Sequence, residues 1–253
     1  MHDIKQEFLE KGISTIQKNL NRFLDKGKIT KEDINLTLDN ISTTTSLENM
    51  KDRELIIEAA TEKFDIKASI FNQLDQITSD ECILASNTSS ISINKIADAT
   101  DRPSKVIGMH FMNPVPVMKL VEVINGYKTT RETTNFVVDI SKEIGKIPIE
   151  CNDSPGFVSN RVLMPMINEA AFCLMEEVAT ADGIDKIMKL GMGHPMGPLK
   201  LADLIGIDVC LYIIKVLHND FGDDKYKPCP ILQEMVEKGN LGCKSGRGFY
   251  SYE

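Results

Sequence analysis

The sequence predicts a two-domain protein: an α/β domain with a mostly parallel sheet over residues 1–152, then an all-α domain over residues 153–253. Strand-like and helix-like segments alternate between residues 55 and 150, which is typical of a layered domain with a parallel sheet. After residue 153 every remaining periodic segment is helix-like. The turn-forming run Cys151-Asn152-Asp153-Ser154-Pro155 separates the two patterns and marks the expected boundary.

The expected elements of the first domain begin with two helices. Apolar residues recur mostly every three or four positions from Ile4 to Lys26, which indicates an amphipathic helix, and Gly27 is placed to end it. A shorter helix over residues 31–38 follows the capping residue Thr30. The alternating part predicts strands at 55–58, 82–86, 106–111, 120–125 and 147–150, and helices at 62–77, 91–98 and 131–144.

The second domain is expected to contain four helices, separated by proline and glycine turns. The glycines at 191, 193 and 197 lie between helices with Pro195 among them and no strand before them. They therefore fail the context that a phosphate-binding glycine loop requires. The expected helices cover residues 156–178, 183–190, 197–217 and 230–238.

Composition argues against several classes of protein. The net charge of -8 is unfavourable for general binding to nucleic acid or to an anionic membrane surface. No apolar span approaches the roughly 20 residues of a membrane helix, and residues 1–20 lack the pattern of a signal peptide. The six cysteines show none of the close spacings of metal or redox motifs. We expect reduced thiols, no metal site, no nucleic-acid or membrane partner, and a cytoplasmic location.

The start of the chain differs from the usual start of a Rossmann-like domain, which is a strand, a glycine-rich turn and a helix that binds pyrophosphate. Here Met1-His2-Asp3 leads directly into a helix. Asp3 stands where a second strand would end and carry a ribose-binding carboxylate, although spacing alone favours a helix cap. We therefore expect an incomplete Rossmann-like domain, shortened by roughly 30 residues at its first strand and helix.

The strongest catalytic candidates lie in residues 108–124. His110 follows an apolar strand, where a histidine is more often a packing residue than a catalyst. Glu122 lies among apolar neighbours, so its carboxylate is expected to leave a buried strand, which is costly unless it is paired. A histidine partner would fix the tautomer of the imidazole and raise its basicity, as a general base requires. This segment alone leaves the catalytic pair and the structural alternative open.

Two further polar stretches fit a site at one edge of the sheet. The run Ala85–Ser90 follows a strand and precedes a helix, so it lies at the carboxyl edge, where open α/β sheets bind ligands. Helix capping by one of its serines is the alternative. Asn160 lies one turn into the first segment of the second domain, and a surface or capping role is its alternative.

Five separated runs, in this order, resemble the 3-hydroxyacyl-CoA dehydrogenase family, and most of all its bacterial 3-hydroxybutyryl-CoA members. The likeness extends from Asp3 to the end of the chain. Five runs in register are much more specific than any one of them. The runs are Ala85–Ser90, His110–Ile124, Asp153–Arg161, Met188–Pro198 and Lys244–Tyr250.

The resemblance implies NAD as the cofactor, an acyl-CoA substrate and roles for individual residues. It implies that His110 is the general acid/base, that Glu122 orients it, and that Ser89 and Asn160 bind the reacting oxygen and the thioester region. Lys18 and Arg22 share one face of the first helix with Lys26, the lysine that the resemblance assigns to the CoA phosphates, and could bind these phosphates with it. A solvated charged face is the preferred interpretation for Lys18 and Arg22. By the same resemblance the cofactor-side residues are Asp3, Glu62, Lys67, Ser89, Asn113 and Lys244, and the CoA-side residues are Lys26, Ser89 and Asn160.

The implied activity is hydride transfer between NAD(H) and (S)-3-hydroxybutyryl-CoA or acetoacetyl-CoA, in butyrate and fatty-acid metabolism. The resemblance also implies a homodimer formed through the helical domain. Two alternatives remain. One is a truncated, non-catalytic homologue that binds acyl-CoA or dimerises, and the other is a hydroxy-acid dehydrogenase that does not use CoA.

Overall fold

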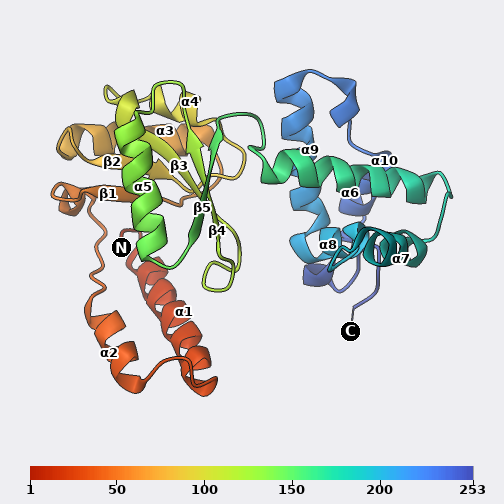
Figure 1. Cartoon of the computed structure of the whole chain (residues 1–253), viewed down its shortest axis with the longest axis horizontal. Coiled ribbons are helices and arrows are strands. Elements are labelled where there is room, and N and C mark those ends of the chain that lie inside the picture. The colour runs from red at the N-terminus through yellow and green to blue at the C-terminus, as the bar shows by residue number, and fades with distance from the viewer. Residues whose placement is uncertain (253) are drawn as a thin grey trace.

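Five short strands form a single sheet in the order β1-β2-β3-β4-β5 in the computed structural model, which describes residues 1–252 (Figure 1). All neighbouring strands are parallel except β3 and β4, which are antiparallel. The expected mostly parallel sheet is therefore confirmed, with strand bounds within two residues of those predicted. The strands are β1 (Leu55–Glu58), β2 (Ile83–Ser86), β3 (Val106–Phe111), β4 (Leu120–Asn125) and β5 (Ile147–Asn152).

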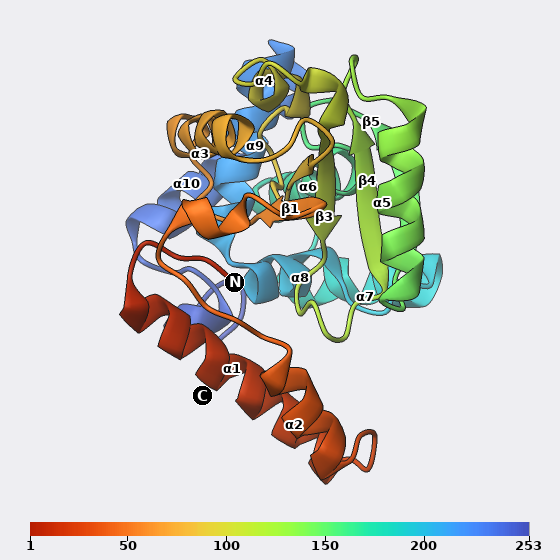
Figure 2. The same ribbon diagram turned by 90° about the vertical axis from the view of Figure 1, so that its left-hand side faces the viewer.

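Helices cover both faces of the sheet (Figure 2). The helices α3 (Phe64–Ile77) and α4 (Ile93–Ala97) pack on one face and α5 (Arg131–Glu143) packs on the other. Because successive side chains of a strand point to opposite faces, each strand contributes to both cores. The α3 side receives Leu84, Val106 and Ile124, and the α5 side receives Ile107, Met109, Val121 and Val123.

The first two helices, α1 (Gln6–Asp25) and α2 (Lys31–Asp39), form a hairpin that projects from the sheet domain (Figures 1 and 2). Gly27, with φ of 65°, follows the end of α1, and Thr30 caps α2 by accepting a hydrogen bond from the Asp33 amide at 3.1 Å. The predicted end of the first helix at Gly27 and the predicted Thr30 cap of the second helix are both confirmed. Leu9 and Ile34 are the buried residues of the hairpin, so most of its side chains are partly or fully exposed.

The helical domain lies beside the sheet and contains α6 to α10 (Figure 1). The prediction of one helix over residues 197–217 is wrong, because Gly206 adopts φ of 107° and separates two helices. Such a backbone conformation is compatible with glycine but not with a continuing helix. The helices are α6 (Ser159–Met175), α7 (Ala181–Met192), α8 (Pro198–Ile205), α9 (Ile207–Phe221) and α10 (Pro230–Glu237).

Short 3-10 turns connect the longer elements, and the sequence patterns did not indicate them. None of the helices within residues 1–252 has the length and apolar character needed to cross a membrane. The six cysteines are free. The 3-10 turns are Leu47–Met50, Pro103–Lys105, Asp224–Tyr226 and Cys243–Ser245.

Candidate active site

His110 and Glu122 form a cross-strand pair at the end of β3. They are direct partners in the antiparallel register of β3 and β4, so both side chains leave the same face of the sheet. His110 Nδ1 lies 2.8 Å from Glu122 Oε2. The His110 side chain is 12% exposed and the Glu122 side chain 5% exposed, so the ring contacts solvent while the carboxylate is enclosed. This geometry matches the paired arrangement that the sequence left open.

Glu122 is also bound by the first residues of α6, at the start of the helical domain. Its Oε1 accepts hydrogen bonds from the backbone N–H of Ser159 at 2.9 Å and of Val158 at 3.3 Å. Its Oε2 accepts one from the Ser159 hydroxyl at 2.7 Å. Burial alone would raise the pKa of Glu122, but the hydrogen bonds from His110 and Ser159 outweigh it and hold this pKa below its ordinary value. Glu122 is therefore a stable anion beside the imidazole.

An unusual backbone directs these N–H groups toward Glu122. Gly156 and Phe157 have φ of 71° and 51°, both in the left-handed region. A Cβ at position 156 would lie 2.8 Å from Leu217 Cδ2 and 3.1 Å from the Arg161 backbone nitrogen, so another residue here would be crowded, and the positive φ favours glycine. Phe157 is buried, and its ring lies 6.0 Å from the His110 ring. Strained residues of this kind persist where their surroundings hold them, often at functional sites.

Asn160 and Ser89 meet across the two domains. Asn160 is buried, and its Nδ2 donates a hydrogen bond to the backbone oxygen of Ser89 at 2.9 Å. Ser89 is half-buried and lies in the loop after β2. Ser159 binds Glu122 and Asn160 binds the Ser89 loop, so the first turn of α6 brings the predicted catalytic residues of both domains together.

Glu62 organises the loop that carries Ser89. Its Oε1 accepts hydrogen bonds from Thr88 Oγ1 at 2.6 Å and from the backbone N–H groups of Ser89 and Ser90 at 2.9 Å each. Burial opposes ionisation of Glu62, but the Thr88 hydroxyl, the charge of Lys67 and the loop N–H groups together lower its pKa. The carboxylate therefore fixes the position of Ser89.

Lys67 occupies a fully buried position on α3. Its Nζ donates to both oxygens of Glu58, at 2.8 and 3.0 Å, and lies 3.4 Å from Glu62 Oε2. Glu58 in turn accepts a hydrogen bond from Ser86 Oγ at 2.7 Å. Lys67 thus ties the ends of β1 and β2 to Glu62, and its predicted contact with the cofactor stays a prediction.

The remaining predicted cofactor residues lie outside this network. Asp3 Oδ1 accepts a hydrogen bond from the Ile4 N–H at 2.7 Å, but the N-cap of α1 is Lys5, so the alternative of Asp3 as the cap is wrong. Asn113 is exposed in the loop between β3 and β4. Lys244 Nζ is paired with Asp208 at 2.5 Å within the helical domain. The roles assigned to these residues remain predictions.

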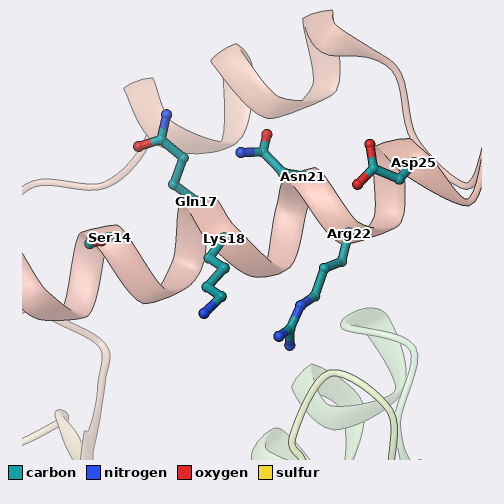
Figure 3. Close-up of a pocket in the computed structure, with 6 residues that line it drawn as sticks. All are labelled: Ser14, Gln17, Lys18, Asn21, Arg22 and Asp25. Carbon is teal, nitrogen blue, oxygen red and sulfur yellow. The ribbon is translucent and has the colours of Figure 1, made fainter.

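The α1 face carries the basic residues that the sequence associated with CoA. Lys18 and Arg22 project to one side of the helix and Gln17 and Asn21 to the other (Figure 3). Lys18 and Arg22 border a surface hollow on α1, and Lys26 follows as the C-cap residue. All three cations are exposed, and none has an ion-pair partner within residues 1–252.

The glycines at 193 and 197 lie between α7 and α8, as predicted, whereas Gly191 lies within the last turn of α7 and not between helices. Gly193 is the left-handed C-cap of α7, and Gly197 is the N-cap of α8. They lie in the helical domain and form no strand-turn-helix unit. The expected shortening of the first domain is not tested by these features and stays a prediction.

Sequence reasoning missed Ser159 and the backbone at Gly156–Phe157. The available signal was their position directly before Asn160 in the run Asp153–Arg161, one of the five runs that resemble the dehydrogenase family. Nothing in that run indicated a contact with Glu122, which lies 37 residues earlier in the chain.

Comparison with known proteins gives consistent matches over both domains. Residues 1–154 match the family "3-hydroxyacyl-CoA dehydrogenase, NAD binding domain", and residues 156–252 match "3-hydroxyacyl-CoA dehydrogenase, C-terminal domain". The chain is 56% identical to a probable 3-hydroxybutyryl-CoA dehydrogenase of Deinococcus radiodurans, over 100% of this chain and 90% of that protein. A probable 3-hydroxybutyryl-CoA dehydrogenase of Bacillus subtilis is 53% identical, over 100% of this chain and 88% of that protein. The crystal structure of (S)-3-hydroxybutyryl-CoA dehydrogenase from Ralstonia eutropha superposes with a TM-score of 0.97 at 48% identity, covering 100% of this chain and 89% of that one.

Proposed function

The chain belongs to the 3-hydroxyacyl-CoA dehydrogenase family, and from this we propose that it interconverts (S)-3-hydroxybutyryl-CoA and acetoacetyl-CoA. It is an enzyme, and NAD is its cofactor. The observation that carries the proposal is the 2.8 Å contact between His110 Nδ1 and Glu122. We place the reaction in butyrate and fatty-acid metabolism. The names of the similar proteins, 3-hydroxybutyryl-CoA dehydrogenases, support this choice of substrate.

His110 exchanges the proton of the reaction through Nε2. Glu122 occupies the Nδ1 side of the ring, so Nε2 is the nitrogen available to the substrate oxygen. In the oxidising direction His110 removes the hydroxyl proton, and Glu122 stabilises the imidazolium that forms. In the reducing direction the same imidazolium returns a proton to the 3-keto oxygen. Ser89 and Asn160 are proposed to hold that oxygen and the thioester region.

The carboxyl edge of the sheet has side chains that fit the cofactor. The half-buried hydroxyl of Ser89 follows β2 and the exposed amide of Asn113 follows β3, and ligands of open α/β sheets bind beyond such strand ends. NAD supplies the hydride acceptor of the reaction. We propose that Glu62, Lys67 and Lys244 act on the cofactor side. The carboxylate of Asp3 favours NAD over NADP, because a 2′-phosphate would meet its negative charge.

The CoA moiety is proposed to bind along α1. Lys26 is the expected contact for its phosphates, and the unpaired cations Lys18 and Arg22 lie on the same exposed helix (Figure 3). Replacing Lys18 and Arg22 by glutamate should raise KM for acetoacetyl-CoA and leave KM for NADH unchanged. Lys31→Glu on α2 is the control. An unchanged KM for the CoA ester would assign these two residues to a solvated face.

Acetoacetyl-CoA and free acetoacetate together test the proposed substrate. NADH oxidation is followed at saturating cofactor with each compound. We expect turnover of the CoA ester and none of the free acid. Equal turnover of the two would favour the hydroxy-acid dehydrogenase that does not use CoA. Binding of the ester without any turnover would favour the non-catalytic homologue, which no observation on this chain supports at present.

We also propose that the protein is a homodimer formed through its helical domain and that it acts in the cytoplasm. Apolar side chains are exposed on α7, α8 and α9, among them Leu190, which is 84% exposed, Leu204 and Tyr212. A second copy of the chain would cover them. Sedimentation equilibrium should give twice the chain mass, and Leu190→Glu combined with Leu204→Glu should give the monomer. The six free thiols suit a reducing compartment.

A further inference from the structure

We propose that Ser159 is a positioning residue which, through Glu122, sets the orientation and the proton affinity of His110. The proposal rests on the proposed function only in taking His110 as the group that exchanges the proton. Ser159 acts without touching the reacting atoms. It lies at the first position of α6, so a residue of the helical domain would control a catalytic pair that is built entirely on the sheet.

The geometry around Glu122 makes Ser159 the main restraint on the carboxylate. The two donors of Ser159 reach different oxygens: its N–H reaches Oε1 at 2.9 Å and its hydroxyl reaches Oε2 at 2.7 Å. Two such bonds from one residue fix both the position and the plane of the carboxylate. Oε2 is also the oxygen that faces His110 Nδ1. The direction of the His110 ring is therefore set by a hydroxyl group that the ring does not contact.

The charge of Glu122 is shared between the imidazole and the beginning of α6. The N–H groups of Val158 and Ser159 present the positive end of the helix to Oε1. Cys151 on β5 is also within the electrostatic influence of this carboxylate, but burial, together with the charges of Glu122 and Asp153, raises the pKa of its thiol to about 11. The thiol therefore stays neutral at the pH of an assay. The titratable partner that responds to Glu122 is then His110.

The Ser159 hydroxyl moderates the effect of Glu122 on His110. A hydrogen bond donated to a carboxylate stabilises its charged form and lowers its proton affinity. Without that bond, the charge on Oε2 acts more strongly on the imidazole, and the imidazolium becomes more stable. Ser159→Ala should therefore raise the midpoint of the His110 titration by about half a pH unit. Glu122→Gln removes the charge itself, so it should move the same midpoint in the opposite direction.

In Ser159→Ala the Glu122 carboxylate and the His110 ring are held less firmly, which should lower kcat more than it affects substrate binding. The backbone N–H bonds to Oε1 remain in Ser159→Ala, so the carboxylate stays in place but is free to rotate about Oε1. Misorientation of a catalytic group reduces the rate on the order of tenfold or more. We expect kcat for acetoacetyl-CoA reduction to fall by about this factor while KM for both substrates stays near the wild-type value.

The experiment combines an NMR titration of the histidine side chains with steady-state kinetics. The sequence has four histidines, so the imidazole signal of His110 can be assigned by its absence in His110→Gln. Ser159→Thr keeps the hydroxyl and should restore the wild-type midpoint and most of kcat. Ser154→Ala is the matched control. It removes a hydroxyl from the same connecting segment, but this hydroxyl accepts a hydrogen bond from Arg161 and does not contact Glu122. Circular dichroism confirms that each variant is folded.

Each outcome supports or overturns the proposal. An upward shift in Ser159→Ala, with wild-type values in Ser159→Thr and Ser154→Ala, supports it. An unchanged midpoint in Ser159→Ala overturns it, as does an equal shift in Ser154→Ala. The titration does not depend on turnover. If the wild-type chain does not reduce acetoacetyl-CoA and the midpoint still shifts as stated, the proposed function fails and the positioning role of Ser159 stands.

Discussion

Two buried glutamates lie at the same edge of the sheet, and the cations beside them differ. Glu58, at the end of β1, is paired with the ammonium group of Lys67 at 2.8 Å, and both side chains are almost entirely buried. Glu122 on β4 is paired with the His110 imidazole, also at 2.8 Å, and this ring retains some exposure. The distances are the same, but the two pairs can do different chemistry.

The difference is the ability of the cation to give up its proton near neutral pH. An imidazole has its ordinary pKa near 6.5 and a lysine near 10.4. An imidazole is therefore suited to the proton exchange proposed for His110, while the Lys67 ammonium holds the loop through Glu58 and Glu62. One pair is suited to proton transfer and the other to fixing the strand ends and Ser89. Substitutions that affect one pair should leave the other intact.

The largest effect is expected for His110→Gln. Glutamine retains most of the volume but cannot serve as the proton donor and acceptor, and losing general acid/base catalysis costs about 10²–10⁴-fold in rate. The free energy of unfolding should change little, because the ring is at the edge of the core. Acetoacetyl-CoA reduction and urea unfolding check both statements. Near wild-type turnover would remove His110 from the mechanism.

Lys67→Met should mainly lower stability. Removing one member of a buried ion pair leaves an uncompensated charge, which costs about 3–5 kcal/mol of unfolding free energy. Lys63→Met, at an exposed lysine of the same segment, is the matched control and should be close to neutral. Urea unfolding measures the loss. A folded, stable Lys67→Met protein whose only defect is a raised KM for NADH would instead establish Lys67 as the cofactor contact that the family resemblance implies.

Glu122→Gln should lower the rate and shift the pH dependence of turnover. In the proposed mechanism the imidazolium of His110 donates the proton that reduces acetoacetyl-CoA, so we expect the rate to fall as pH rises. Glutamine no longer stabilises the imidazolium, and the falling limb should therefore move to lower pH, by about one unit. Rate measurements between pH 5 and 9 test this, with Glu150→Gln on β5 as control. An unshifted limb would mean that the carboxylate is only structural.

The smallest effect is expected for Glu62→Gln, on the thermal stability of the fold at acid pH. The pKa of Glu62 is lowered in the folded protein, so its ionised form stabilises the fold above the ordinary value of 4.5. That contribution is lost as pH falls from about 4.5 through the lowered folded pKa. Glu62→Gln should therefore reduce the drop in Tm between pH 6 and pH 3.5, and the exposed Glu48→Gln should not. Equal drops in Tm in the wild type and Glu62→Gln would contradict this account.

The sequence by itself determined the strands, the ends of the first helices and the candidates for catalysis. Strand bounds follow from short apolar runs between turn residues, and the signals at Gly27 and Thr30 act within a few residues of themselves. His110 and Glu122 could be singled out because a carboxylate among apolar strand residues requires a partner. These properties depend on neighbours in the chain, so they can be read without the fold.

Only the tertiary structure decided which distant groups meet. The antiparallel register places His110 opposite Glu122, and the first turn of α6 brings Ser159 to Glu122 and Asn160 to Ser89. The burial of Lys67 could not be inferred either, because a lysine on a helix is ordinarily solvated. Each contact joins segments at least nine residues apart, and most join different elements. Their formation depends on how the layers pack, which no local pattern encodes.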